Sequence, residues 1–121
     1  MTTYVVLISG DEAAWAARSA ADRAVTMQAH ETFSRALAER GHTVTAGEEL
    51  TPSRGGRVAR RVGDGFEVTD GPYAETVEQL GGFYVVESDD LDDLVQIAGE
   101  LALTEGAVEV REAVDHSGDL G

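Results

Sequence analysis

The chain has 121 residues, of which 42% are hydrophobic, and this suffices for one domain with an ordinary core. Its formal net charge of -14 argues against partners that are nucleic acids or anionic membranes. Cysteine and lysine are both absent, which excludes disulfides, thiolate nucleophiles and Schiff bases on lysine. The lack of cysteine fits a reducing compartment, so we expect a cytoplasmic protein.

The first forty residues predict a strand followed by two helices. Residues 4–8 are apolar at every position, which indicates a strand buried on both faces. A short helix is expected over residues 12–17 and a longer one over residues 20–40. Ser19 has the character of an N-cap residue for the longer helix, and Gly41 stands where a helix commonly ends.

One face of the longer helix carries the apolar residues that would reach the core. At 100° per residue this stripe consists of Ala29, Phe33, Ala36 and Leu37. His30 falls at the edge of the stripe, so we expect its ring to lie where the buried face meets a more polar surface.

The rest of the chain predicts mainly strands. In chain order we expect a strand at 42–46, a hairpin with arms 57–62 and 66–69, a strand at 82–87, a helix at 90–102 and a strand at 107–111. The acidic run before the second long helix is typical of a helix start and does not indicate a metal site. We expect residues 1–114 to form the domain and residues 115–121 to form a flexible tail.

The order of elements is βαββαβ with an extra hairpin, which predicts an α+β, ferredoxin-like fold with both long helices on one face of the sheet. The strands at 4–8 and 82–87 are apolar on both faces. The two long helices can cover only one face of the sheet that these strands form. An exposed sheet face would be a large apolar patch. We therefore expect a homodimer packed sheet to sheet, with pockets between sheet and helices or at the subunit boundary.

The connection DGPYAETVEQLGG, which begins at Asp70, contains more turn residues than an ordinary loop needs. Gly71 permits a backbone angle that other residues avoid, and Pro72 fixes the next one. The Thr-Val-Glu-Gln sequence at 76–79 has the pattern of a capping box and predicts one short helical turn. A rigid turn explains the glycines and the proline, but it does not require polar residues at Asp70, Glu75 or Thr76.

The segment VTDGPYAETVEQLGGFYVVE, together with DDLDDL and VEVRE downstream, resembles the YCII-related family, and in particular its branch with a DGPF motif. The resemblance covers nearly the whole chain to about residue 114 and implies a fold similar to the dimeric α/β barrels. It also implies a bacterial protein with a His/Asp active site, in a family whose members are largely uncharacterised. One branch is associated with dehydrochlorinase chemistry, and DGPF-type proteins are often encoded near alternative sigma factors. Tyr73 replaces the usual Phe, and Val77 stands where Lys is common.

His30 and Asp70 are the predicted catalytic pair. A neutral imidazole facing Asp70 would be held in one tautomer and could take a proton from a substrate carbon or from water. The alternative is a structural histidine bonded to a backbone carbonyl. Gly71, Pro72 and Tyr73 are predicted to bind substrate, and so is Arg60, which would hold an anionic group unless it lies on the hairpin surface.

Two functions follow from these residues. The first is a small enzyme without a cofactor that binds a small, partly apolar molecule and catalyses isomerisation, elimination or hydrolysis. The second is a non-catalytic ligand-binding or regulatory dimer that works with a partner such as a sigma factor. No metal site is expected, because the histidines are scattered and have no ligand spacing. The two functions differ in whether the imidazole and the carboxylate meet inside a pocket.

Overall fold

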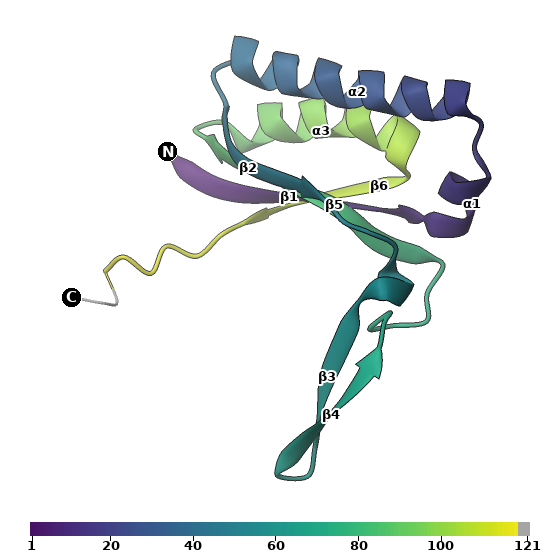
Figure 1. The fold of residues 1–121 in the computed structure, drawn as a ribbon. Helices are drawn as coiled ribbons and strands as arrows, with labels where there is room; N and C mark the ends of the chain where they lie inside the picture. The colour runs from purple at the N-terminus through teal and green to yellow at the C-terminus, as the bar shows by residue number, and fades with distance from the viewer. Residues whose placement is uncertain (119–121) are drawn as a thin grey trace.

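A four-stranded antiparallel sheet organises the chain, whose computed structural model describes residues 1–118 (Figure 1). The strand order is β2-β5-β1-β6, and the strands are Thr43–Glu49, Glu78–Ser88, Thr2–Asp11 and Ala107–Glu112 in that order. Each neighbouring pair is antiparallel. The predicted α+β class is confirmed, and the topology is compatible with a ferredoxin-like arrangement.

The two long helices, α2 (Ala20–Glu39) and α3 (Leu91–Glu105), lie side by side on one face of the sheet (Figure 1). Both begin where the sequence predicts, because polar side chains cap them. Ser19 Oγ accepts from an amide in the first turn of α2 at 3.1 Å, and Asp90 Oδ1 does the same for α3 at 3.1 Å. A short helix, α1 (Glu12–Ala17), precedes α2.

The core lies between the sheet and the two long helices. Alternate residues of the central strands face it, so Val6 and Val86 are fully buried while their neighbours in sequence point to the other side. The helices contribute the remaining apolar side chains, including the predicted Phe33 and Leu37. The buried apolar residues are Tyr4, Val6, Ile8, Phe33, Leu37, Val86, Leu94, Ile97, Ala98 and Leu101.

The opposite face of the sheet is apolar at its centre, as the two-sided strands predict. Val5 pairs with Val85 and Leu7 pairs with Phe83 across β1 and β5, and all four side chains are only partly buried. Paired residues of an antiparallel ladder point to the same face. Within residues 1–118 neither long helix lies over this open face (Figure 1).

A two-stranded hairpin extends away from the sheet on the side opposite the long helices (Figure 1). It consists of β3 (Arg57–Val62) and β4 (Gly65–Asp70) and follows a single turn of 3₁₀ helix, η1 (Ser53–Gly55). The predicted hairpin is thus confirmed. Its attachment to the body involves the Glu12 carboxylate, which accepts from both the amide and the hydroxyl of Ser53 at 2.8 Å.

The connection from β4 to β5 differs from the prediction in two respects. Gly71 does not have a positive φ; it is required because a Cβ at this position would overlap the carbonyl oxygen of Ser53. The predicted helical turn at 76–79 is wrong. The Thr76 hydroxyl donates to the Glu78 carbonyl at 2.6 Å instead of capping a helix, and β5 begins at Glu78.

The C-terminal tail expected over residues 115–121 extends beyond residue 118, so its last three residues lie outside the described part of the chain. The helices found in residues 1–118 include none with both the length and the apolar character that crossing a membrane requires.

Candidate functional site

His30 lies between two polar partners at the edge of the core. Its Nε2 atom is 2.6 Å from the Glu105 carboxylate, and its Nδ1 atom is 2.7 Å from the Tyr84 hydroxyl. The side chains of His30 and Glu105 are 22% and 20% exposed, so solvent still reaches this pair from one side. His30 lies at the margin of the apolar stripe, as predicted, so its side chain is partly buried and still reaches polar partners.

Three elements bring these residues together. His30 is in the middle of α2, Glu105 is the last residue of α3, and Tyr84 projects from β5 toward the helices. The Tyr84 ring packs against Phe33, with ring centroids 5.1 Å apart, so its apolar part belongs to the core. Its hydroxyl then reaches a polar side chain of α2, as buried tyrosines usually require.

The environment keeps Tyr84 protonated. Burial raises the pKa of its hydroxyl above the ordinary value of 10.0, a hydrogen bond with Ser34 lowers it, and the negative charge of Glu105 raises it. The carboxylate of Glu105 only accepts hydrogen bonds, so His30 Nε2 carries the proton in their contact. In the neutral ring, Nδ1 is then the acceptor of the Tyr84 hydroxyl proton.

This order of donors forms a carboxylate, imidazole and phenol relay. Glu105 fixes the tautomer and orientation of the His30 ring, as a carboxylate does for a catalytic histidine. Tyr84 can pass its hydroxyl proton to His30 Nδ1 as its oxygen takes a proton from a bound molecule, and the reverse transfers return both protons. The arrangement can therefore move a proton without a cofactor.

Arg18 holds the helices together beside this relay. Its guanidinium donates to Thr26 Oγ1 at 3.0 Å and to the Thr104 carbonyl at 3.2 Å. Thr26 lies on α2 one turn before His30, and Thr104 is next to Glu105, so Arg18 fixes the spacing of the two helices where the relay crosses between them. Arg18 also lies over the Trp15 ring, at 5.3 Å from its centroid.

The predicted partner of His30 lies elsewhere. Asp70 is at the base of the hairpin, 82% exposed, and its carboxylate is 3.5 Å from the guanidinium of Arg57. Both ring nitrogens of His30 are bonded to other groups. Within residues 1–118 of one chain, His30 and Asp70 therefore have separate partners, and a catalytic role for Asp70 stays a prediction.

The predicted substrate-binding residues lie near Asp70 and away from His30. Arg60 donates to the Tyr73 carbonyl, and its guanidinium lies 5.0 Å from the centroid of the exposed Tyr73 ring. Gly71 and Pro72 are partly buried, and the Gly71 amide donates to the Gly56 carbonyl at 2.7 Å. The structure thus brings these four residues together at the base of the hairpin.

The sequence model of the family described as the YCII-related domain matches residues 2–117. The chain belongs to the YCII-related family. An uncharacterized protein of Rhizobium meliloti (strain 1021) is 32% identical over 111 residues, which are 89% of this chain and 89% of that protein. The similarity to the family thus extends through the hairpin as well as the sheet and helices.

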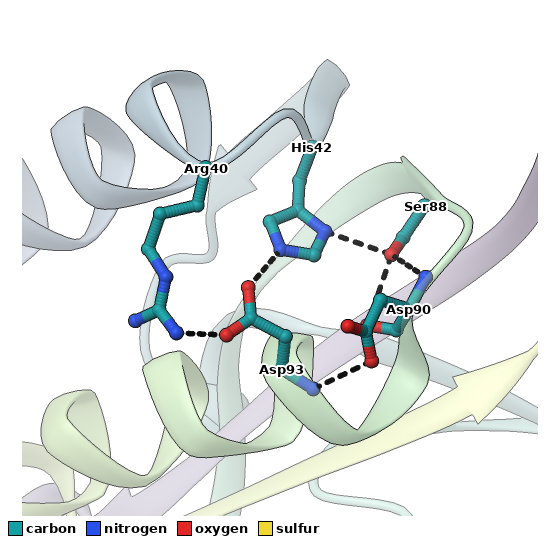
Figure 2. Close-up of polar contacts among 5 residues, drawn as sticks. All are labelled: Arg40, His42, Ser88, Asp90 and Asp93. Carbon is teal, nitrogen blue, oxygen red and sulfur yellow. Dashed lines mark hydrogen bonds and ion pairs between the residues drawn. The ribbon is translucent and has the colours of Figure 1, made fainter.

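This YCII-related domain contains a second histidine cluster, shown in Figure 2. The ring of His42 lies between Ser88 Oγ, 2.7 Å from Nδ1, and Asp93 Oδ2, 2.7 Å from Nε2. Arg40 pairs with the other oxygen of the Asp93 carboxylate. The residue types are those of a serine hydrolase triad, but geometry and access decide whether such a set is catalytic.

Ser88 cannot act as a nucleophile here because no substrate can reach it. Its side chain is fully buried, and the His42 side chain is 2% exposed. Ser88 Oγ also accepts the Asp90 amide at 3.0 Å, so the cluster joins the end of β5 to the cap of α3 and to the residue before β2. We assign this set a structural role within the YCII-related domain.

Sequence reasoning missed Tyr84, Glu105 and the His42 cluster. The available signal was modest: Glu105 ends an amphipathic helix, and Tyr84 is the one residue with a hydroxyl in the run 83–86. Within residues 1–118 of the YCII-related domain, no three His, Cys, Asp or Glu side chains gather in a group that could hold a metal ion.

Proposed function

We propose that this YCII-related domain is a proton-transfer enzyme that needs no cofactor and acts on a small, partly apolar carbonyl compound. In this proposal the Tyr84 oxygen takes a proton from a substrate carbon or from water while its own proton passes to His30 Nδ1, Glu105 orients His30 and stabilises the imidazolium that forms, and the reverse transfers return both protons. Isomerisation through an enol, elimination and hydrolysis all need such a group. The observation that supports the proposal is the contact of both His30 ring nitrogens, one with a carboxylate and the other with a phenol.

The proposal assigns to Glu105 the orienting role that the sequence suggested for Asp70. A carboxylate 2.6 Å from the imidazole is in position for that role, whereas Asp70 bonds to Arg57. Asp70, Arg60, Gly71, Pro72 and Tyr73 remain proposed ligand contacts at the base of the hairpin. Membership of the DGPF branch, a cytoplasmic location and a homodimer belong to the same proposal, supported by the sequence motif, the lack of cysteine and the open sheet face.

A second function is favoured by a different aspect of the same contacts. Because both nitrogens of His30 already have partners at 2.6 and 2.7 Å, the ring could be a fixed support that holds α2, α3 and β5 in place around a ligand. The domain would then bind a small molecule without transforming it. The two functions differ in whether the relay residues affect a reaction rate.

The experiment compares purified wild-type protein with Tyr84→Phe, His30→Gln and Glu105→Gln on two carbonyl probes. These are 4-nitrophenyl acetate, whose hydrolysis releases a coloured phenolate, and acetophenone, whose methyl hydrogens exchange with deuterium through the enol. We expect each variant to lose about 100-fold of the wild-type rate above buffer. His116→Gln, in the C-terminal segment, is the control histidine variant. Equal rates for wild type and all three relay variants would contradict the enzymatic proposal and favour the binding function.

A further inference from the structure

A glycine of β2 lies opposite Tyr84 in the sheet. Gly47 pairs with Tyr84, so both residues face the side of the sheet on which the helices lie. Among residues 1–118 the glycines with a positive φ are at positions 41, 63 and 106, so the backbone angle does not require a glycine at position 47. Glycine weakens the interior of a strand and often marks a place where another group comes close.

The group that comes close to Gly47 is the Tyr84 ring. A Cβ atom at position 47 would lie 2.8 Å from Cδ1 and 3.3 Å from Cε1 of Tyr84. Contacts of Cβ atoms below 3.0 Å are essentially never found, so an alanine here would displace the ring. The same Cβ would lie 3.2 Å from the Phe83 carbonyl oxygen, a tight contact that a small backbone shift relieves. The ring therefore occupies the space that a side chain at position 47 would need.

A β-bulge in β2 brings this glycine opposite Tyr84. The pairing of β2 with β5 passes from Val44 to Ala46, so Thr45 is the extra residue. In a regular ladder, Ala46 would stand opposite Tyr84. The bulge shifts the register by one residue, and the position that faces the ring consequently has no side chain.

Helix α2 contacts the same ring. The ring centroid of Phe33 lies 5.1 Å from that of Tyr84, and the ring centroid of His30 lies 5.9 Å from it. With the ring seated between these residues and Gly47, the hydroxyl lies 2.7 Å from His30 Nδ1. Because a phenol is rigid, a shift of the ring edge beside Gly47 also moves the hydroxyl away from this position.

We propose that Gly47, brought opposite Tyr84 by the bulge at Thr45, is a positioning residue of the relay. It leaves room for the Tyr84 ring and so fixes the hydroxyl at His30 Nδ1. Bulges are frequent next to active sites, where they redirect a side chain. The effect on a reaction rests on the proposed function, whereas the positioning itself can be measured without any reaction.

The first experiment uses wild-type protein and needs no variant. One α proton of Gly47 occupies the direction of the missing Cβ and therefore points at the edge of the Tyr84 ring. In protein labelled with ¹³C and ¹⁵N, we expect a nuclear Overhauser effect between this proton and the δ or ε ring protons of Tyr84. Its absence would overturn the proposal. This measurement decides the contact even if a variant at position 47 does not fold.

The second experiment compares Gly47→Ala with the matched control Gly82→Ala. Gly82 belongs to the same pair of strands, and a Cβ there would lie 3.0 Å from the Glu48 carbonyl oxygen, with its nearest contacts in the backbone of Glu48 and Glu49. The control therefore strains the same ladder through backbone contacts instead of the Tyr84 ring.

The measurement is the ¹⁵N chemical shift of His30 Nδ1, with circular dichroism to check that each variant is folded. We expect Gly47→Ala to move this resonance to the position seen in Tyr84→Phe, in which the hydroxyl is missing. Gly82→Ala should keep the wild-type shift. A wild-type shift in folded Gly47→Ala, or the same change in the control, would overturn the proposal.

The rates of the same variants separate this inference from the proposed function. With 4-nitrophenyl acetate we expect Gly47→Ala to lower kcat by about 10-fold or more with KM nearly unchanged, because a misplacement of about 1 Å can cost about 100-fold. Gly82→Ala should keep the wild-type rate. If wild type shows no rate above buffer, the proposed function fails and the Nδ1 shift still decides the positioning. If Tyr84→Phe loses the rate and Gly47→Ala keeps it, the positioning is overturned and the proposed function stands.

Discussion

The Nδ1 atom of His30 lies 2.7 Å from the hydroxyl oxygen of Tyr84, and this polar contact joins a helix to the sheet beneath it at the edge of an apolar core. Hydrogen bonds in such positions contribute about 1 kcal/mol to stability, and an unpaired partner left behind costs more. The contact is therefore measurable by mutation whether or not it takes part in a reaction.

A double-mutant cycle on His30 and Tyr84 tests this contact. Tyr84→Phe is expected to lower the free energy of unfolding by about 1 kcal/mol, and His30→Ala by about 1 to 3 kcal/mol, because it also leaves Glu105 without its partner. The double variant should lose less than the sum of the two. Urea unfolding followed by circular dichroism provides the measurement. Tyr73→Phe, at an exposed ring, is the control and should change stability by less than about 0.5 kcal/mol.

Alkaline pH should reveal the environment of Tyr84. Its pKa is raised in the folded protein because burial disfavours the phenolate, so the unfolded chain releases this proton at lower pH than the folded one. The stability due to this group is complete below the ordinary value of 10.0 and is lost as the pH rises through the higher folded value. Absorbance at 295 nm should show a late-titrating tyrosine in wild type. Tyr84→Phe should abolish this late step, and its persistence would show that another tyrosine causes it.

Gly71→Ala should be destabilising for a steric reason. A Cβ at this position would overlap the Ser53 carbonyl oxygen, which belongs to backbone and cannot rotate away. We expect a loss of about 1 to 3 kcal/mol in thermal or urea unfolding. Gly55→Ala is the matched control, since no atom lies within 4 Å of its added carbon. Equal stability of the two variants would contradict the close approach of Ser53 to Gly71.

Ser88→Ala tests the structural assignment of the His42 cluster. The change removes a buried hydroxyl bonded to His42 and to the Asp90 amide, so we expect a loss of about 1 to 3 kcal/mol. The exposed Ser117→Ala should have little effect. A fluorophosphonate reagent, which labels activated serines, should leave Ser88 unmodified in the folded protein. Labelling at Ser88 would show that the site opens and that the triad-like geometry is functional.

Local signals in the sequence identified most elements of the fold. Ser19 and the acidic run from residue 89 onward correctly predicted where the two long helices begin. Capping depends on residues only three positions apart, so it can be read from local sequence. Strand ends were less accurate: the strand predicted at 42–46 continues in β2 through Glu48 and Glu49. Their pairing with β5 is a tertiary interaction that outweighs the low strand propensity of glutamate.

The candidate site was only half predictable. The position of His30 followed from helical periodicity, but Glu105 is 75 residues away in sequence, and no local pattern joins the two. The helical turn expected at 76–79 failed for a local reason. Gln79 uses its side chain to donate to the carbonyls of Ala74 and Thr76 at 2.8 and 3.0 Å, which stabilises an irregular loop as well as a helix would.

The central position of β1 has a consequence for synthesis of the protein in the cell. Strand β1 is translated before β5 and β6, with which it pairs, and their residues follow it by about 70 to 110 positions. Non-local pairing of this kind slows folding, and it cannot begin until most of the chain has been translated. During that interval the apolar segment Tyr4–Ile8 has no partner strand, which makes the nascent chain a substrate for chaperones that bind extended hydrophobic sequences.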